Sequence, residues 1–217
     1  MTEQLAFDLS VRPAFGRSNF WVTPCNQEAI AWIDKYPAWP MHALLIYGEA
    51  GSGKTHLAAI FSEERIEAED LTEDFMPSGE KIVVENLEKI KNETALFHLF
   101  NRVHEQGGGL LMTAKQVPHF QLPDLQSRIG MTPKVEIQMP DENTIMLVCA
   151  KMFSDKQAIV EASVLMYIAT HIPRSFDMVR KVVNMADELS LAQGRRITIY
   201  VVKEAMEKLA KLGGCNA

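Results

Sequence analysis

His-Ala-Leu-Leu-Ile-Tyr-Gly-Glu-Ala-Gly-Ser-Gly-Lys-Thr, residues 42–55, is the stretch of sequence that decides the fold. Its first six residues form a short apolar run that ends at a glycine, which is typical of a strand buried on both faces of a sheet. Residues 48–55 satisfy the pattern G-x-x-x-x-G-K-[ST] at every fixed position, and residues 55–64 have a helical composition. A strand, a glycine-rich loop and a helix in this order are the context in which the pattern binds phosphate.

Each fixed position of the pattern has a chemical reason. Glycines let backbone amides turn inward around phosphate oxygens, and the following helix adds the positive end of its dipole. The Lys54 ammonium can reach the β- and γ-phosphates, and the Thr55 hydroxyl can ligate magnesium. The motif therefore predicts ATP or ADP with Mg²⁺ as the ligands. The rest of the predicted phosphate loop is Gly48, Gly51, Ser52 and Gly53.

A second apolar run, residues 82–84, ends in Glu85 and Asn86. Phosphate-loop enzymes hold Mg²⁺ with a carboxylate at the end of a neighbouring strand, and a further acid orders the attacking water. Glu85 fits the metal position, although a solvated loop residue is the alternative. Asn86 can hold a water but cannot accept its proton. The sequence therefore favours nucleotide binding over hydrolysis.

The remaining pattern alternates strands with helices and then becomes entirely helical. Such alternation predicts an α/β fold with a parallel sheet flanked by helices. Further strands are expected at residues 110–113 and 134–138, and helices at residues 26–36 and 93–105. Beyond Pro140 helices are expected at residues 141–153, 155–171, 175–193 and 198–212. We therefore predict an arm at residues 1–20, a nucleotide-binding α/β domain at 21–139 and a small helical lid domain at 140–217.

Composition excludes several classes of protein. The chain has 217 residues, 47% of them apolar and 23% charged, which is typical of a packed soluble protein. A net charge of −6 disfavours unaided DNA binding, which usually needs a basic surface. Cys25, Cys149 and Cys215 are too widely spaced for a metal or redox motif and are interpreted as reduced thiols. With no long apolar stretch and no signal-like start, we expect a cytoplasmic protein without a membrane segment.

Two further features have structural interpretations. Residues 63–74 are strongly acidic and are interpreted as a solvated linker. Four methionines lie in apolar-periodic segments and are expected in the core. They are Met112, Met146, Met152 and Met166.

The phosphate-loop segment resembles the DnaA-related AAA+ family, and more closely its shorter regulatory members, the Hda-like inactivators of DnaA. Residues 47–57 are similar to the family's "YG…GxGKTHL" segment, including His56 after the threonine. Glu85 and Asn86 stand where the initiators carry two acids. Residues 113–118 resemble the segment after the sensor-1 strand, which implies that Thr113 is the sensor-1 residue. Lys115 departs from the acid expected there.

The resemblance also implies two functional arginines. Residues 122–128, Leu-Pro-Asp-Leu-Gln-Ser-Arg, resemble the family's "L-x-x-L-x-SR" arginine-finger segment. By this resemblance Arg128 projects toward a neighbouring subunit's nucleotide, where a guanidinium neutralises charge on the γ-phosphate. Arg174, near a predicted helix start, stands where the family places its sensor-2 arginine. An ordinary surface role is the alternative for either arginine.

The amino-terminal arm resembles the peptide by which proteins bind the bacterial sliding clamp. The pattern is Q-L-x-[LF]-x-[LF], in which the glutamine supplies amide hydrogen bonds and the apolar residues are anchors. One face of an edge strand is the alternative, because the apolar residues alternate. The residues concerned are Gln4, Leu5, Phe7, Asp8 and Leu9.

The resemblance implies a regulatory function. It implies a nucleotide-binding protein that docks on the DNA-loaded β clamp of DNA polymerase III at the replisome, stimulates hydrolysis of ATP bound to DnaA, and so restrains replication initiation. Its own ATPase activity is expected to be weak or absent, direct sequence-specific DNA binding is not expected, and a homo-oligomer is possible. The alternatives are a self-sufficient ATPase of the helicase-loader type and a clamp-tethering adaptor with a structural nucleotide.

Overall fold

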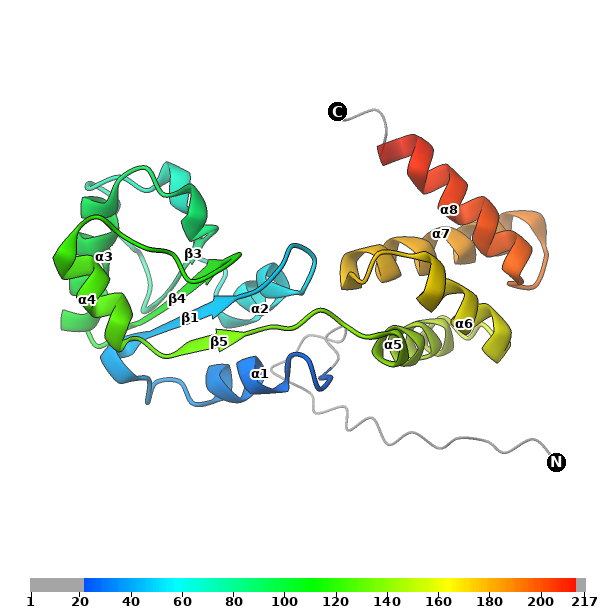
Figure 1. Ribbon diagram of the computed structural model, residues 1–217, viewed down its shortest axis with the longest axis horizontal. Helices are drawn as coiled ribbons and strands as arrows, with labels where there is room; N and C mark the ends of the chain where they lie inside the picture. Colours follow the sequence, from blue (N-terminus) through cyan, green and yellow to red (C-terminus); the bar gives the residue numbers. More distant parts are fainter. Residues whose placement is uncertain (1–21, 214–217) are drawn as a thin grey trace. The chain divides into compact units, whose positions relative to one another are not determined.

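The computed structural model describes residues 22–213 and contains a five-stranded parallel sheet (Figure 1). The order across the sheet is β2-β3-β4-β1-β5, and every neighbouring pair is parallel. Because the strands are parallel, their carboxyl ends meet at one edge of the sheet. The strands are β1 (Ala43–Tyr47), β2 (Arg65–Glu67), β3 (Lys81–Glu85), β4 (Gly109–Ala114) and β5 (Lys134–Glu136).

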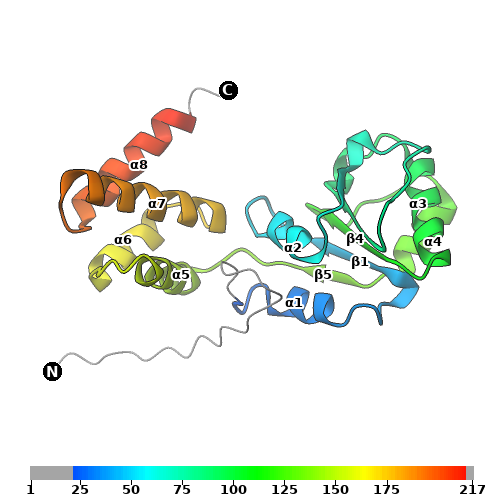
Figure 2. The same cartoon turned by 180° about the vertical axis from the view of Figure 1, so that it is seen from behind.

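Helices cover both faces of this sheet. On one face pack α1 (Gln27–Asp34) and α2 (Lys54–Phe61), and on the other α3 (Glu93–Glu105) and α4 (Pro123–Met131). The helices α3 and α4 contact each other and lie side by side in views from opposite directions (Figures 1 and 2). The described residues also include three single-turn helices: η1 (Pro40–His42), η2 (Ala68–Asp70) and η3 (Leu87–Lys89).

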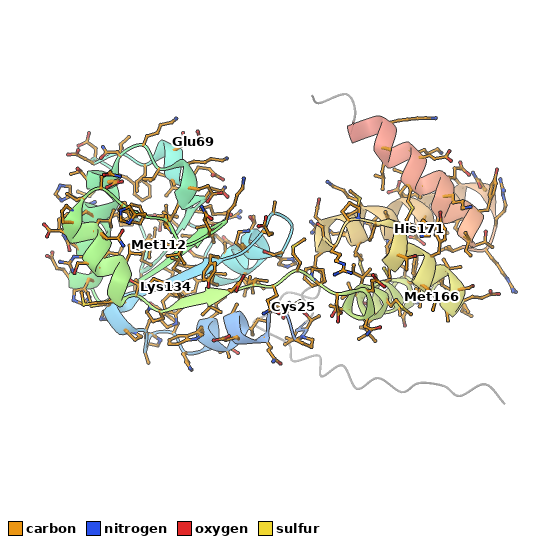
Figure 3. The ribbon with its side chains drawn as sticks, viewed as in Figure 1. Cys25, Glu69, Met112, Lys134, Met166 and His171 are labelled. Carbon is orange, nitrogen blue, oxygen red and sulfur yellow. The ribbon has the colours of Figure 1, made fainter. Side chains whose placement is uncertain are left out.

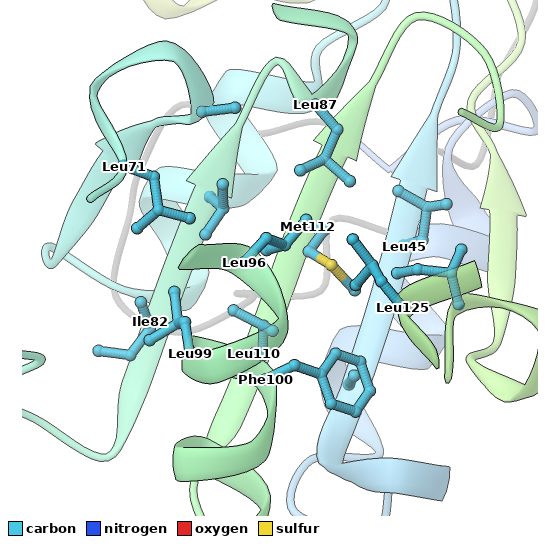
Figure 4. Close-up of a cluster of buried hydrophobic side chains, with 14 of the residues drawn as sticks. Leu45, Leu71, Ile82, Leu87, Leu96, Leu99, Phe100, Leu110, Met112 and Leu125 are labelled. Carbon is cyan, nitrogen blue, oxygen red and sulfur yellow. The ribbon is translucent and has the colours of Figure 1, made fainter. Parts of the chain in front are cut away.

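Alternation along the strands divides the core in two. In β1, Leu45 faces α3 and α4, whereas Leu44 and Ile46 face α1 and α2. Figure 4 shows the first of these layers, in which Phe100 of α3 and Leu125 of α4 lie over the sheet. Because both faces are buried, the strands are continuously apolar, as the sequence predicts.

The chain packs as two compact units. Among the described residues, one comprises residues 22–49 and 53–138, and the other comprises residues 50–52 and 139–213. The helices of the second unit are α5 (Glu142–Asp155), α6 (Ala162–His171), α7 (Phe176–Gln193) and α8 (Ile199–Gly213). Asp141 caps α5 by accepting a hydrogen bond from the Thr144 amide at 2.7 Å. None of the described helices is long and apolar enough to cross a membrane.

The predicted fold class is confirmed, with local corrections. The interpretation of residues 63–74 as a solvated linker is wrong, because this stretch contains β2 and η2 and buries Ala68 and Leu71. The helix expected over residues 155–171 is shorter, since α5 ends at Asp155 and α6 begins at Ala162.

The methionine prediction fails at one position. Met112 and Met152 are buried and Met146 is half-buried, but Met166 on α6 is 57% exposed (Figure 3). The buried face of α6 consists of Val164, Ile168 and Ala169. Met166 belongs to the apolar pattern of the helix but lies outside this buried face.

Candidate nucleotide-binding site

The glycine-rich loop between β1 and α2 has backbone angles that favour glycine. Gly51 has φ +80°, and Gly53, the residue before α2, has φ +105°. A Cβ atom is strained in this region of backbone space, whereas glycine adopts it readily. The loop therefore uses the glycines of the motif for its shape.

Lys54, the first residue of α2, folds back onto this loop. Its Nζ donates hydrogen bonds to the carbonyls of Gly48 at 2.6 Å and Glu49 at 2.8 Å, and only 8% of the residue is exposed. Burial lowers the pKa of the ammonium, while the charges of Glu88 and Glu49 act in the opposite direction. Among residues 22–213, no carboxylate lies within ion-pair distance of Lys54. A phosphate would be a stronger partner for this cation than two neutral carbonyls.

Ser52 and Thr55, which precede and follow Lys54 in the sequence, carry hydroxyl groups. The Ser52 Oγ is buried and has no hydrogen-bond partner within the described chain. Buried hydroxyls are normally satisfied, so the atom has an unused capacity for a phosphate oxygen or a water. Thr55 is exposed in the first turn of α2, and His56 beside it is half-buried. These groups fit a phosphate ligand.

Glu85 ends β3 at the carboxyl edge of the sheet and is 6% exposed. Its Oε1 lies 3.3 Å from Nη1 of Arg65 on β2. Removing a buried carboxylate's partner leaves an uncompensated charge, so Arg65 stabilises Glu85 in this position. A metal ion bound by Glu85 would have to share the carboxylate with Arg65 or displace it.

Asn86 follows Glu85 in the left-handed conformation, with φ +59°. Its Nδ2 donates to Oε2 of Glu67 at 2.8 Å, and its backbone amide donates to Oγ1 of Thr113 at 3.2 Å. Thr113 is 1% exposed on β4, between β3 and β1. The predicted sensor-1 residue is thus in contact with the residue after Glu85, and the Asn86 side chain is directed to β2.

Lys115, the departure from the family pattern, is exposed just beyond β4. Its backbone amide donates to Oε2 of Glu88 at 3.1 Å. Its charge lies close enough to Lys54 to contribute to the lowered pKa of that residue. Lys115 therefore adds positive charge at the edge where phosphate would bind.

Arg128 lies in the last turn of α4 and is half-buried. The carbon at the centre of its guanidinium lies 5.5 Å from the ring centroid of Phe97 and 5.7 Å from that of Phe100. No carboxylate of the described chain forms an ion pair with it. Arg128 therefore presents a cation that is supported by aromatic rings but not neutralised.

Arg174 belongs to the helical unit, just before α7. Its Nη2 lies 3.1 Å from Oε1 of Glu142, and its side chain is 58% exposed. An exposed ion pair of this kind contributes little to stability. The sensor-2 role of Arg174 stays a prediction, as does the clamp-binding role of residues 4–9, which lie outside the described residues.

Sequence reasoning missed two residues of this edge, Arg65 and Glu67. Both lie on β2, a three-residue strand in the acidic stretch, and they hold the side chains of Glu85 and Asn86. The only sequence signal was one isoleucine between two charged residues, and a pattern of three residues is too short to indicate a strand.

Comparison with known proteins identifies relatives of this chain. A scan against protein-family models finds no match. The initiator protein DnaA of Synechococcus sp. (strain JA-2-3B'a(2-13)) is 28% identical over 198 residues, covering 74% of this chain and 42% of the relative. DnaA of Magnetococcus marinus is 23% identical over an alignment of 246 residues, covering 96% of this chain and 55% of the relative. The chain spans about half the length of the curated relatives it matches.

Solved structures give the same fold. Domain III of the Thermotoga maritima replication initiation protein DnaA matches with a TM-score of 0.73 at 20% identity, covering 91% of this chain and 97% of that domain. The RuvB Holliday junction branch migration motor of T. maritima matches with a TM-score of 0.64 at 15% identity, covering 85% and 67%. The chain therefore has the AAA+ fold of DnaA domain III, and DnaA proteins are among its homologues.

Proposed function

We propose that this chain is a regulatory protein that binds ATP or ADP with Mg²⁺. The Lys54 ammonium would exchange the carbonyls of Gly48 and Glu49 for phosphate oxygens, and the buried Ser52 hydroxyl would gain its missing partner. Thr55 and Glu85 would hold the magnesium ion, which neutralises phosphate charge when bound. The fold and the unpaired Ser52 hydroxyl of the loop support this step.

The residues at the end of β3 support nucleotide retention over turnover. Glu85 is already paired with Arg65, and Asn86 is an amide that cannot accept a proton from water. The Asn86 side chain is also bonded to Glu67 at 2.8 Å, so it has a partner other than an attacking water. We therefore expect slow hydrolysis of the chain's own nucleotide.

The regulatory step is assigned to Arg128. A partner in the DnaA family that carries ATP would place its γ-phosphate against this guanidinium, which would neutralise the charge that develops during hydrolysis. Faster hydrolysis would leave DnaA in its ADP-bound form, and replication initiation would be restrained. The single observation that carries this proposal is the unneutralised Arg128 on α4 of a chain with the fold of DnaA domain III.

The amino-terminal arm would bring the protein to its place of action. Gln4, Leu5 and Leu9 supply the amide and apolar groups of a clamp-binding peptide. Attachment to a clamp on DNA would raise the effective concentration of Arg128 near DnaA on the same DNA, without any new contact to DnaA.

A direct experiment follows hydrolysis of ATP pre-bound to DnaA in the presence of this protein, purified clamp and DNA. Wild type is compared with Arg128→Ala and with Gln4→Ala/Leu5→Ala, and clamp binding is measured for each. We expect stimulation by wild type alone, with clamp binding retained in Arg128→Ala. Unchanged DnaA hydrolysis with wild type would overturn the proposal. Equal stimulation by wild type and Arg128→Ala would exclude the role of Arg128 and would favour the alternative of a clamp-tethering adaptor.

A self-sufficient ATPase is the second candidate, and one observation favours it. Glu67 stands 2.8 Å from Asn86 Nδ2, so the edge holds a second carboxylate on β2 even though residue 86 is an amide. Turnover of ATP by the isolated protein, lost in Glu67→Gln, would support this candidate over the regulatory one.

A further inference from the structure

Glu93 connects α3 to the start of α4. Its Oε1 accepts a hydrogen bond from the Gln121 amide at 3.0 Å, and its Oε2 accepts one from the Leu122 amide at 2.7 Å. Leu122 is the residue immediately before α4. A carboxylate bonded to two consecutive amides forms two charge-assisted bonds, which fix both the distance and the direction of the helix start.

These bonds are not needed for the start of α3 itself. Asn92 already caps that helix, because its Oδ1 accepts a hydrogen bond from the Ala95 amide at 3.0 Å. An acidic residue in the first turn also favours the helix dipole, but this interaction does not require bonds to another segment. Both carboxylate oxygens of Glu93 instead bond to residues 121 and 122.

The same helix supports the other end of α4. Phe97 follows Glu93 by four residues, so the two side chains lie on one face of α3. The Phe97 ring lies under the Arg128 guanidinium, at the end of α4 away from Glu93. Leu125 and Ile129 of α4 are completely buried in the core layer that contains Phe100 of α3. Figure 4 shows Leu125 and Phe100 in this layer. Helix α3 therefore contacts α4 at its start, along its buried side and at Arg128.

We propose that Glu93 is a positioning residue for Arg128. By tying the start of α4 to α3, it sets where Arg128 lies on Phe97 and the direction in which the guanidinium points. Its functional consequence rests on the proposed function, in which Arg128 acts on a nucleotide held by a partner. Glu93 itself touches no substrate.

The chain offers a matched control. The Glu64 carboxylate also accepts hydrogen bonds from two consecutive amides, those of Ser78 at 2.6 Å and Gly79 at 2.8 Å. Glu64 lies between α2 and β2 and does not bond to α4. Glu64→Gln therefore disturbs the same kind of contact elsewhere in the same unit. In either variant the neutral glutamine loses both charge-assisted bonds, because its oxygen accepts only an uncharged bond from one backbone N–H and its NH2 group, a donor, faces the other.

The first test uses NMR on the full chain and needs no partner protein. Amide hydrogen exchange is measured at Gln121 and Leu122, and the Arg128 Nε–H signal, assigned by its loss in Arg128→Lys, reports the ring current of Phe97. Glu93→Gln is expected to speed exchange at both amides and to shift the Arg128 signal, while Glu64→Gln leaves that signal unchanged. Faster exchange without a shift of Arg128 would overturn the positioning role.

The second test measures hydrolysis of DnaA-bound ATP under saturating protein. A displacement of about 1 Å at a reacting group commonly lowers a rate about 100-fold, so Glu93→Gln should lower the stimulated rate roughly 10- to 100-fold. Glu64→Gln should stimulate as wild type does, and Glu93→Gln/Arg128→Ala should be no slower than Arg128→Ala alone. Undiminished stimulation by Glu93→Gln would overturn the inference. Absent stimulation by wild type would overturn the proposed function, while the shift of the Arg128 signal still decides the positioning role.

Discussion

Replacing Lys54 by methionine should separate nucleotide affinity from stability. The substitution removes the ammonium but keeps a long unbranched side chain in the same buried space. Lys54 donates two hydrogen bonds to carbonyls in the free protein, and both donors would turn to phosphate oxygens on binding. A hydrogen bond to a charged group contributes about 1.5–3 kcal/mol. Two such bonds contribute about 3–6 kcal/mol, but the two carbonyl bonds are given up when they form, so the expected net loss is about 1.4–2.8 kcal/mol, or roughly 10- to 100-fold in Kd.

The free energy of unfolding should change much less in the same variant. The lost bonds to Gly48 and Glu49 are offset because a buried charge disappears with them. Isothermal titration with ADP and Mg²⁺ measures the affinity, and urea denaturation without nucleotide measures the stability. Lys81→Met is the control, since that exposed lysine begins β3, at the opposite edge of the parallel sheet, and should alter the affinity by no more than about threefold. An affinity of Lys54→Met within threefold of wild type would refute the reasoning.

Three further predictions concern stability and reactivity. Phe100→Ala should lower the free energy of unfolding by about 3–5 kcal/mol in urea denaturation, because the ring is completely buried; a loss below about 1 kcal/mol would contradict this placement. The hydrogen bond with Thr144 holds the pKa of Asp141 below its usual value. The charged Asp141 carboxylate therefore stabilises the folded protein above about pH 4, and this stabilisation is lost as pH falls through the folded-state pKa. Asp141→Ala should therefore cost about 1 kcal/mol at pH 7 and less at pH 3, and an equal cost at both would refute this. Burial raises the pKa of the Cys149 thiol to about 12. With Cys25 and Cys215 replaced by serine, alkylation of Cys149 by iodoacetamide at pH 8 should proceed only as fast as unfolding exposes the thiol. Equal alkylation rates with and without urea would contradict the burial of Cys149.

The α/β unit was predictable because its signals are local. The apolar run before Gly48 is buried on both faces of the sheet, so no alternation obscures it, and the loop pattern requires a helix directly after it. The helix at residues 93–105 has a clear apolar face, and its predicted bounds match those of α3. In such segments, the residues that define the element also form its core.

Other elements depend on partners that the local sequence does not show. The strand β2 has three residues, two of them charged, and it forms because it pairs with β3 and because Arg65 and Glu67 reach Glu85 and Asn86. Pairing between distant segments leaves no periodic signal in so short a strand. The surroundings of Glu85 were unpredictable for the same reason.

Helix α4 is a different case, because a usable signal was present. Pro123 stands in its first turn, Asp124 follows it, and Leu125 and Ile129 are four residues apart on one buried face. The bonds between Glu93 and residues 121–122 could not be seen in the sequence, since 28 residues separate the two groups.

The most direct test of the proposed function is single-turnover hydrolysis of ATP bound to DnaA, in the presence of clamp and DNA. Arg128→Lys keeps a positive charge but loses the planar fork of donors, so it tests the guanidinium itself. We predict stimulation by wild type, and none by Arg128→Lys or Arg128→Ala, although all three proteins bind the clamp equally. Stimulation by Arg128→Ala at the rate of wild type would contradict the role proposed for this arginine.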